Sequence, residues 1–240
     1  MDNKIRHYSD EEIDISFDAR RCIHAEECVH GLPVVFETAR RPWVLPNAAS
    51  ADAIAAVITK CPSGALHYTR RDGCKAETAP EQPTIAPVAD GPLYVRGCVQ
   101  LRSADGNVIV DDMRLALCRC GQSRNKPFCD NSHRSSGFKD SGVVTNGGGR
   151  PETKTTDVMK ITASANGPLL VEGPFVLRGA GGVGRYDGAQ AELCRCGGSR
   201  NKPFCDGTHQ EIGFRTEETS GTGGAADNEH QKSLPVSLSQ

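Results

Sequence analysis

The sequence is poor in aromatic residues and contains no long apolar run. Only 5% of its 240 residues are aromatic, which is too few for one large hydrophobic core. Glycine is abundant by contrast, with 26 residues. This composition favours several small units that need something besides apolar burial to stay folded. Because no apolar stretch approaches the ~20 residues of a transmembrane helix, we expect no membrane association.

The sequence also lacks an excess of either charge and an export signal. Its 28 basic and 30 acidic residues give a formal net charge of −2, which offers no reason to expect binding to nucleic acid. The first residues, MDNKIRHYSDEEID, are polar and acidic and lack the apolar core of a signal peptide. We therefore expect a cytoplasmic protein. No phosphate-binding loop and no G-x-S-x-G motif is present, and we do not expect an enzyme.

Cysteine is the residue type that carries the most information. The chain has eleven cysteines, an odd number, so internal disulfide pairing cannot be complete. In a reducing cytosol, closely spaced cysteines are more often metal ligands than disulfide partners. The cysteine pattern therefore predicts metal sites.

The second half of the chain contains an internal duplication. GPLYVRG at 91–97 matches GPLLVEG at 167–173, and CRCG at 118–121 matches CRCG at 194–197, with the same offset of 76 residues. Without gaps, 26 of the 48 positions from 91 to 138 are identical in the second copy. Each copy has strand signals before its cysteines and few helix signals, so each is predicted to be a small β-rich unit. Asp130 and Asp206 are placed to cap a short helical turn after the third cysteine.

Each repeat offers four candidate metal ligands in two pairs. The cysteines of C-x-C point to the same side of an extended chain, and a cysteine and histidine four residues apart share one face of a helical turn. One zinc ion could take all four ligands, and a two-iron cluster could take one pair on each iron. The C-x-C spacing is tight for zinc and favours the cluster. The ligand pairs are Cys118 with Cys120, Cys129 with His133, Cys194 with Cys196, and Cys205 with His209.

The segment CRCGGSRNKPFCDGTH at 194–209 resembles the CDGSH iron–sulfur motif of the mitoNEET-like family, C-x-C-x₂-S/T-x₃-P-x-C-D-G-S/A/T-H. The second copy has every fixed residue, and the first departs once, with Asn131 in place of glycine. The resemblance implies one [2Fe–2S] cluster per motif, with Cys118 and Cys120 on one iron and Cys129 and His133 on the other. Likewise it implies that Cys194 and Cys196 share one iron, and Cys205 and His209 the other. Single-motif members resemble two-fold dimers, which implies an intramolecular pseudo-dimer here and a monomeric chain with internal pseudo-two-fold symmetry.

A second cysteine pattern lies near the N-terminus. CIHAEEC at 22–28 and KCPSGAL at 60–66 resemble the divergent single-cluster ferredoxins over about residues 13–70. Cys22, Cys28 and Cys61 are the expected ligands, and Ala25 replaces the middle cysteine of the bacterial pattern. Three cysteines suffice for a [3Fe–4S] cluster, whereas a [4Fe–4S] cluster needs a fourth ligand, for which His24 is the first candidate and Cys74 the second. Absence of a cluster here is the remaining alternative.

These patterns predict an α+β protein with a small ferredoxin-like N-terminal domain and two β-rich CDGSH repeats. In the first domain we expect extended segments at 13–18, 41–46 and 65–71 and a helix at 51–60. The predicted divisions are a ferredoxin-like domain at 1–76, a linker at 77–90, the first repeat at 91–144, a connecting segment at 145–166, the second repeat at 167–215 and a disordered tail at 216–240.

The expected function is electron transfer, with unidentified redox proteins as partners. The alternative is an iron–sulfur carrier or redox or pH sensor, because a histidine ligand can be protonated and lost, and its partners would be apo iron–sulfur acceptors. A zinc-stapled binding module is a minor alternative. Cys98 belongs to no motif and is expected to be buried. The basic residues of both motifs are expected to offset cluster charge or to dock an acidic partner: Arg119, Arg124, Lys126, Arg195, Arg200 and Lys202.

Overall fold

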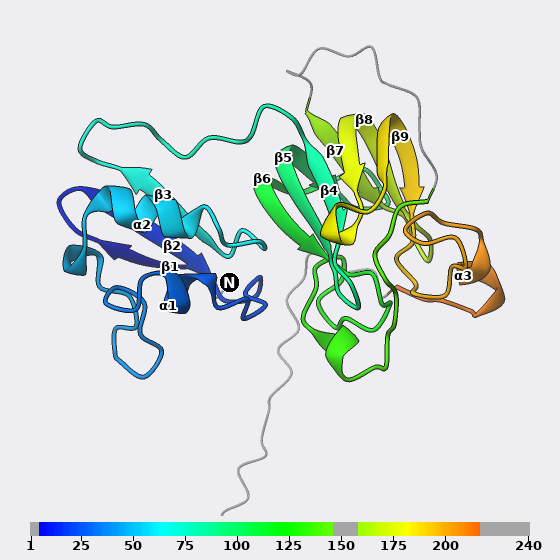
Figure 1. The fold of residues 1–240 in the computed structure, drawn as a ribbon, viewed down its shortest axis with the longest axis horizontal. Helices are drawn as coiled ribbons and strands as arrows, with labels where there is room; N and C mark the ends of the chain where they lie inside the picture. Colours follow the sequence, from blue (N-terminus) through cyan, green and yellow to red (C-terminus); the bar gives the residue numbers. More distant parts are fainter. Residues whose placement is uncertain (1–4, 146–157, 217–240) are drawn as a thin grey trace, which may run out of the picture.

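The computed structural model describes residues 5–145 and 158–216. The chain forms two parts, a small N-terminal domain and a larger β-rich part that contains both repeats (Figure 1). The prediction of a small N-terminal unit followed by β-rich repeats is therefore confirmed. None of the helices in the described ranges has the length and apolar character needed to cross a membrane. Of the predicted tail at 216–240, residues 217–240 lie outside the described residues.

The N-terminal domain is a three-stranded antiparallel sheet with three short helices. Its strands are β1 (Ile5–Ser9), β2 (Ile13–Asp18) and β3 (Leu66–Arg70), in the order β1-β2-β3, and its helices are α1 (Glu27–Gly31), η1 (Pro46–Ala48) and α2 (Ala51–Ile58). Alternating Ile13 and Ile15 point into the core against Ile54 and Ile58 of α2, and all four are fully buried. The hydroxyl of Ser50 accepts from the amide of Ala53 and caps α2.

The repeats share one six-stranded sheet. Its strands are β4 (Thr84–Pro87), β5 (Leu93–Arg102), β6 (Val108–Leu117), β7 (Met159–Ala163), β8 (Leu169–Arg178) and β9 (Arg185–Leu193). The hairpins β5–β6 and β8–β9 are the corresponding parts of the two copies. The turn of the second hairpin contains the short helix η3 (Ala180–Gly182). Apolar side chains from both copies, such as Leu101 and Leu177, fill one buried cluster.

The first strand of each copy pairs with both hairpins. β4 runs antiparallel to β5 of its own copy and parallel to β8 of the other, with Thr84 opposite Val176. β7 likewise runs antiparallel to β8 and parallel to β5, with Lys160 opposite Gln100. These two parallel pairings are related by the same 76-residue offset as the sequence repeat. Each copy therefore completes the sheet of the other.

Four predictions from the sequence differ from the structure. The proposed linker at 77–90 contains β4, and the proposed connecting segment at 145–166 contains β7. Both strands are short, and each pairs both with the next strand of its own copy and with a distant strand of the other copy that local sequence does not show. The segment 41–46 is not a strand, although Val44 forms an isolated bridge with Phe36. Cys98 is exposed rather than buried, because the bulge between Arg96 and Val99 turns it out of the sheet.

Buried charged groups join the N-terminal domain to the first repeat. The Arg21 guanidinium lies 2.5 Å from the Asp112 carboxylate of β6 and also donates to the carbonyls of Ser63 and Arg114. Arg114 donates in turn to the carbonyl of Leu66. Both arginine side chains are at most 10% exposed, so these bonds fix how the two parts sit together.

Candidate metal centres

In each repeat, a loop folds back on the strand before it and gathers the ligand residues. β6 ends at Leu117, and Cys118 follows directly. The loop returns antiparallel, because Leu117 pairs with Phe128 and the amide of Cys129 donates to the carbonyl of Ala116. The second motif repeats this arrangement, with a bridge between Leu193 and Phe204 and a bond from the amide of Cys205 to the carbonyl of Glu192.

The two sulfurs of each C-x-C segment are spaced to bind one metal atom. The Sγ atoms of Cys118 and Cys120 lie 3.8 Å apart, and those of Cys194 and Cys196 have the same separation. Two thiolates on one tetrahedral metal, each bonded at about 2.3 Å, lie about 3.8 Å apart. The chain therefore holds each pair in a ligating arrangement.

The other pair of each motif is a cysteine and a histidine on a short helical turn. The Sγ of Cys129 lies 3.5 Å from Nδ1 of His133 on η2 (Ser132–Arg134), and the Sγ of Cys205 lies 3.4 Å from Nδ1 of His209 on α3 (Thr208–Glu211). Aspartate caps both turns as predicted. Asp130 accepts from the amides of Ser132 and Arg124, and Asp206 accepts from those of Thr208 and Arg200.

The thiols of each C-x-C pair share a proton. The hydrogen bond from Cys118, helped by the backbone amide of Gln122, lowers the pKa of Cys120 to about 6. The same bond, together with burial, raises the pKa of Cys118. In the second motif the pKa of Cys196 is lowered to about 6 by its bond with Cys194. The hydrogen bond of each pair thus favours the thiolate form of one cysteine, and binding of a metal cation would favour loss of the second proton.

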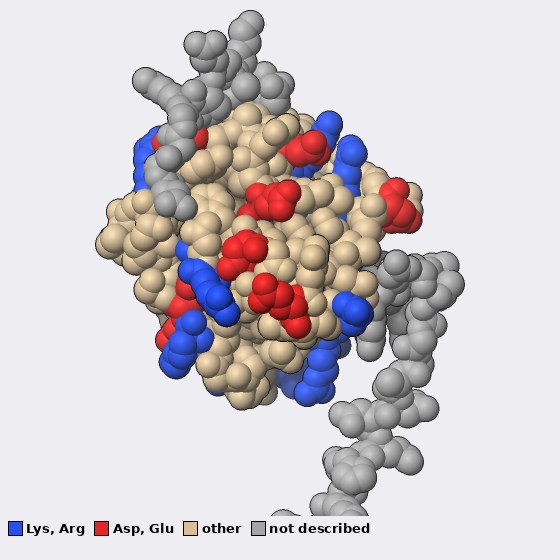
Figure 2. Space-filling model, turned by 90° about the vertical axis from the view of Figure 1, so that its right-hand side faces the viewer, with Lys and Arg blue, Asp and Glu red and all other residues tan. Residues whose placement is uncertain are grey.

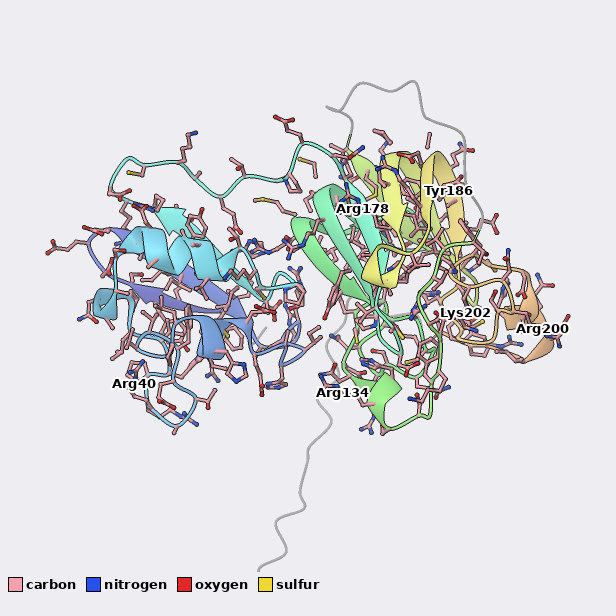
Figure 3. The ribbon with its side chains drawn as sticks, in the orientation of Figure 1. Arg40, Arg134, Arg178, Tyr186, Arg200 and Lys202 are labelled. Atoms are coloured by element: carbon pink, nitrogen blue, oxygen red, sulfur yellow. The ribbon has the colours of Figure 1, made fainter. Side chains whose placement is uncertain are left out.

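The basic residues of the motifs divide into structural and exposed groups. Arg119 and Arg195 are only 1% and 3% exposed. Their guanidinium groups donate to the carbonyls of Gly91 and Gly167, and Arg119 also pairs with Asp140. These two arginines therefore hold the residues just before β5 and β8 against the motif of the same repeat. Of the other basic residues of the second motif, Arg200 is exposed, whereas Lys202 is partly buried and donates to the carbonyl of Ser199. Figure 3 shows both on the side away from the N-terminal domain.

Figure 2 shows that this side of the molecule carries basic and acidic side chains in a mixture, without one dominant sign. The surface around the second motif therefore does not by itself select an anionic or cationic partner.

The two motifs approach each other through their glycines. A Cβ on Gly121 would lie 2.4 Å from the carbonyl oxygen of Cys196, and a Cβ on Gly197 would lie 2.7 Å from that of Cys120. Both glycines have φ near +80°. The contact is reciprocal, so each C-x-C segment packs against the same segment of the other copy.

The three N-terminal cysteines line one cavity. Cys22 from the loop before α1, Cys28 from α1 itself and Cys61 from the segment after α2 surround a space of about 660 Å³, and His24 also lines it. Cys74 does not line this cavity and is exposed. Burial raises the pKa of Cys28 to about 11, with a further contribution from Cys61. Burial and the same neighbour also raise the pKa of Cys22.

The donor sets fit iron–sulfur ligation. The repeats offer cysteine pairs and cysteine–histidine pairs at single-metal spacing, and the N-terminal cavity gathers three thiols whose ionised forms would repel one another. A cationic metal centre would offset that repulsion. In the described ranges, no three of the His, Cys, Asp and Glu side chains are arranged for a single metal ion. The ligands of each repeat lie instead in two pairs.

Several residues that matter for these sites were missed in the sequence. Arg21, Asp112 and Arg114 connect the N-terminal domain to the first repeat. One signal could have found the last two: they differ from their counterparts Gly188 and Gln190 in the second copy. Asn131, which the motif comparison did single out, makes a further connection to the N-terminal domain.

Comparisons with known proteins agree with the two cysteine patterns. Residues 8–71 match the family described as divergent 4Fe–4S mono-cluster, and residues 90–134 and 166–210 each match the iron-binding zinc finger of CDGSH type. The "Uncharacterized protein YjdI" of Escherichia coli strain K12 is 37% identical over 71 residues, which make up 30% of this chain and 93% of that relative. YjdI of Escherichia coli O157:H7 gives the same values. No solved structure matches the chain.

Proposed function

Because the chain belongs to the iron–sulfur proteins, with a divergent 4Fe–4S mono-cluster domain followed by two CDGSH-type domains, we propose that it is an electron-transfer protein with three clusters. The observation that carries this proposal is the single-metal spacing of the sulfurs in each C-x-C pair, and the cavity lined by Cys22, Cys28 and Cys61 supports it. Each repeat would hold one [2Fe–2S] cluster, with the C-x-C pair on one iron and the Cys–His pair on the other. Such clusters supply one-electron redox chemistry.

The N-terminal cavity would hold a [3Fe–4S] or [4Fe–4S] cluster on Cys22, Cys28 and Cys61. His24 lines that cavity, and its backbone has φ of +48°, a conformation uncommon for histidine. We propose His24 rather than Cys74 as the fourth ligand of a four-iron cluster, since Cys74 is exposed and does not line the cavity.

We also propose that the two repeats form an intramolecular pseudo-dimer. Support comes from the exchanged strands β4 and β7, whose parallel pairings repeat at the 76-residue offset. The reciprocal contacts of Gly121 and Gly197 add to it. One chain would then provide both halves of the arrangement that single-motif proteins make from two.

This chain's residues would raise the reduction potentials of the repeat clusters in two ways, by ligand charge and by hydrogen bonding. A neutral imidazole in place of a fourth thiolate makes each repeat centre one unit less negative, which raises its reduction potential relative to an all-cysteine centre. Backbone amides also donate to the ligand sulfurs: that of Gln122 to Cys120, at 3.5 Å, and that of Gly198 to Cys196, at 3.3 Å. These bonds stabilise negative charge on sulfur, with the same effect on potential.

The deciding experiment is an absorption spectrum of anaerobically purified protein with iron and sulfide counts. Loading of the repeats alone would give about four irons per chain, and an added N-terminal cluster would give about seven or eight. A reversible change of the visible spectrum on reduction is expected. A colourless protein that contains zinc without iron or sulfide would refute the proposal and favour a zinc-stapled binding module.

Cluster transfer to an apo iron–sulfur acceptor is the second candidate function. It is favoured by the greater exposure of the second centre: Cys205 is half-buried, whereas Cys129 is 4% exposed. If the chain is a carrier, His209→Cys should slow transfer to an apo acceptor several-fold, because a thiolate ligand is lost less easily than imidazole. His133→Cys is the matched control at the covered site and should have a smaller effect. Equal transfer rates in all three proteins would count against a carrier.

A further inference from the structure

The two repeats differ at the positions that face the N-terminal domain. The motif segments 118–130 and 194–206 are identical at 12 of their 13 positions. Five positions of the first copy that contact the N-terminal domain nevertheless have a different residue in the second copy. These pairs are Tyr94 and Leu170, Arg96 and Glu172, Asp112 and Gly188, Arg114 and Gln190, and Asn131 and Gly207.

Each of the polar residues among these five bonds to the N-terminal domain. Arg96 donates to the carbonyl of Thr59 at 3.1 Å. Asp112 and Arg114 form the buried contacts with Arg21 and Leu66 described above. The first repeat therefore has a docking face, and the ligand-bearing loop of the N-terminal domain lies on it.

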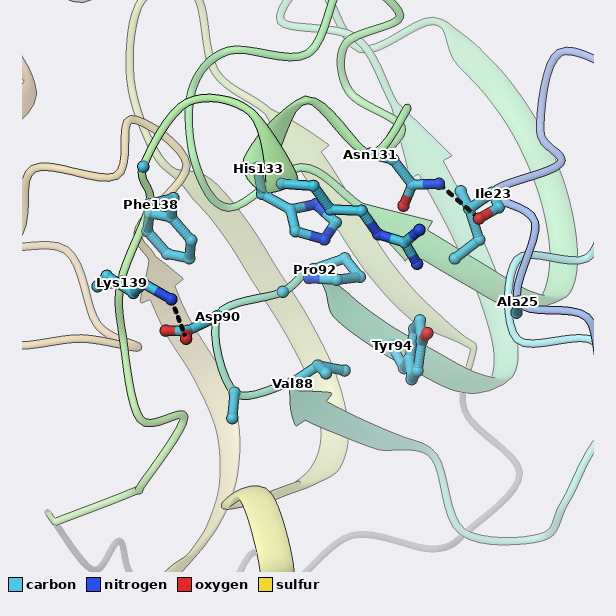
Figure 4. Close-up of a pocket in the computed structure, with 14 residues that line it drawn as sticks. Ile23, Ala25, Val88, Asp90, Pro92, Tyr94, Asn131, His133, Phe138 and Lys139 are labelled. Carbon is cyan, nitrogen blue, oxygen red and sulfur yellow. Dashed lines mark hydrogen bonds and ion pairs between the residues drawn. The ribbon is translucent and has the colours of Figure 1, made fainter.

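Asn131 connects a ligand of one centre to the ligand loop of the other. Its backbone amide donates to the Sγ of Cys129 at 3.3 Å. Its side-chain Nδ2 donates to the carbonyl of Ile23 at 2.5 Å, and Ile23 directly follows Cys22. Figure 4 shows this side chain reaching across to Ile23, with His133 and Tyr94 lining the same cavity.

Apolar packing closes the same junction. Ile23, Ala116 and Cys129 form one buried cluster, with Tyr94 packed against it. Ile23 and Cys129 are each only 4% exposed. In the second copy Cys205 is half-buried, and a Cβ on Gly207 would meet no atom within 4 Å. The N-terminal loop thus covers a ligand of the first centre, while the corresponding position of the second centre stays open.

We propose that Asn131 is a positioning residue that ties the Cys22 loop to the ligand pair Cys129 and His133, so that the N-terminal and first-repeat centres form one coupled unit. The coupling rests on the proposed function, since it requires both centres to hold clusters. The docking of the loop does not, and it can be tested on the metal-free chain.

A simpler role for Asn131 is backbone conformation alone. Its φ is +70°, in the left-handed region that glycine and asparagine adopt more readily than other residues. Two substitutions separate the roles. Asn131→Gly restores the glycine of the motif and removes the side-chain donor. Asn131→Asp keeps the size and the left-handed tolerance but also removes the donor. Gly207→Asn is the matched control in the second copy.

The experiment measures hydrogen–deuterium exchange of residues 20–28 in the metal-free and iron-loaded full chain, together with iron and sulfide content. Loss of the bond should speed exchange of this loop about five- to tenfold in both Asn131 variants. The control should match the wild type. In the loaded protein, electron paramagnetic resonance of the reduced centres should show a magnetic interaction between the N-terminal and first-repeat signals that is weakened in both Asn131 variants.

The outcomes are separable. Wild-type exchange and spectra in Asn131→Gly would show that the residue serves only its backbone conformation and would overturn the proposal. Faster exchange without a change in the magnetic interaction, in protein with full iron content, would overturn the coupling. If the N-terminal site takes up no iron, the three-cluster proposal and the coupling both fail, and exchange in the metal-free chain decides whether Asn131 docks the loop.

Discussion

At the scale of single residues, Gly121 and Gly197 determine how closely the two repeats can pack. Each lies against the carbonyl of a ligand cysteine in the other copy, at distances that no side chain could occupy without a backbone shift. Each also adopts φ near +80°, where a Cβ is strained. The sequence motif contains these glycines, but only the structure shows that they face the other motif.

Gly121→Ala should destabilise the repeats by more than backbone strain alone. The left-handed conformation costs about 1–2 kcal/mol for a residue with a Cβ, and the overlap with the carbonyl of Cys196 should add about 1–3 kcal/mol. Gly106→Ala is the control, because Gly106 has φ of +84° and no atom within 4 Å of the added Cβ. Urea unfolding followed by circular dichroism measures both. Equal losses of stability in the two variants would contradict the close packing of the motifs.

At the scale of elements, the exchanged strands β4 and β7 should make the two repeats unfold together. Ile85 of β4 and Ile161 of β7 occupy equivalent positions, are each 1% exposed and belong to the same apolar cluster. Truncation of either to alanine should cost about 2–5 kcal/mol. Because each strand pairs with both hairpins, the protection of backbone amides from hydrogen exchange should fall to a similar extent in both copies. Hydrogen exchange measured separately for each strand tests this expectation. Loss confined to the mutated copy would contradict the shared core.

The same two strands show which elements could be predicted. The strand at 13–18 and the helix at 51–60 were predicted, because their apolar periodicity and cap are local. β4 and β7 were assigned to linkers, because their partners in the other copy are about 60 to 90 residues away. The candidate ligands of the repeats were found because each set lies within sixteen residues.

At the scale of the whole molecule, the domain arrangement depends on charges that no motif predicts. Arg21 and Asp112 are 91 residues apart in sequence, and each looks like an ordinary surface charge until the fold brings them together. His67 belongs to no sequence motif, yet it bonds to both Glu77 and Asp112 between the two parts. The local sequence pattern gives no information on such pairs. A comparison of the two repeats does, because Asp112 has Gly188 as its counterpart in the second copy.

This buried network should make the docking of the two parts pH-dependent. Burial alone would lower the pKa of His67, but its hydrogen bonds with Asp112 and Glu77 outweigh burial and raise the pKa to about 9. Arg21 and Arg114 bind the same carboxylates, and the pKa of Asp112 is lowered to about 2. The contribution of His67 to folding stability is therefore complete below its unfolded pKa of about 6.5 and is lost as pH rises through 9. The contribution of Asp112 to folding stability is present above about pH 4 and is lost as pH falls through 2.

We expect the stability of the full chain to fall by up to about 3 kcal/mol between pH 6 and pH 9.5, with a larger radius of gyration at the higher pH. Thermal unfolding and small-angle X-ray scattering measure the two effects. His67→Gln should be less stable at pH 6 and should lose most of this pH dependence, because glutamine has no proton to release. His7→Gln, on the exposed strand β1, should keep the wild-type dependence. A wild-type slope in His67→Gln would mean that other groups control the docking of the N-terminal domain on the first repeat.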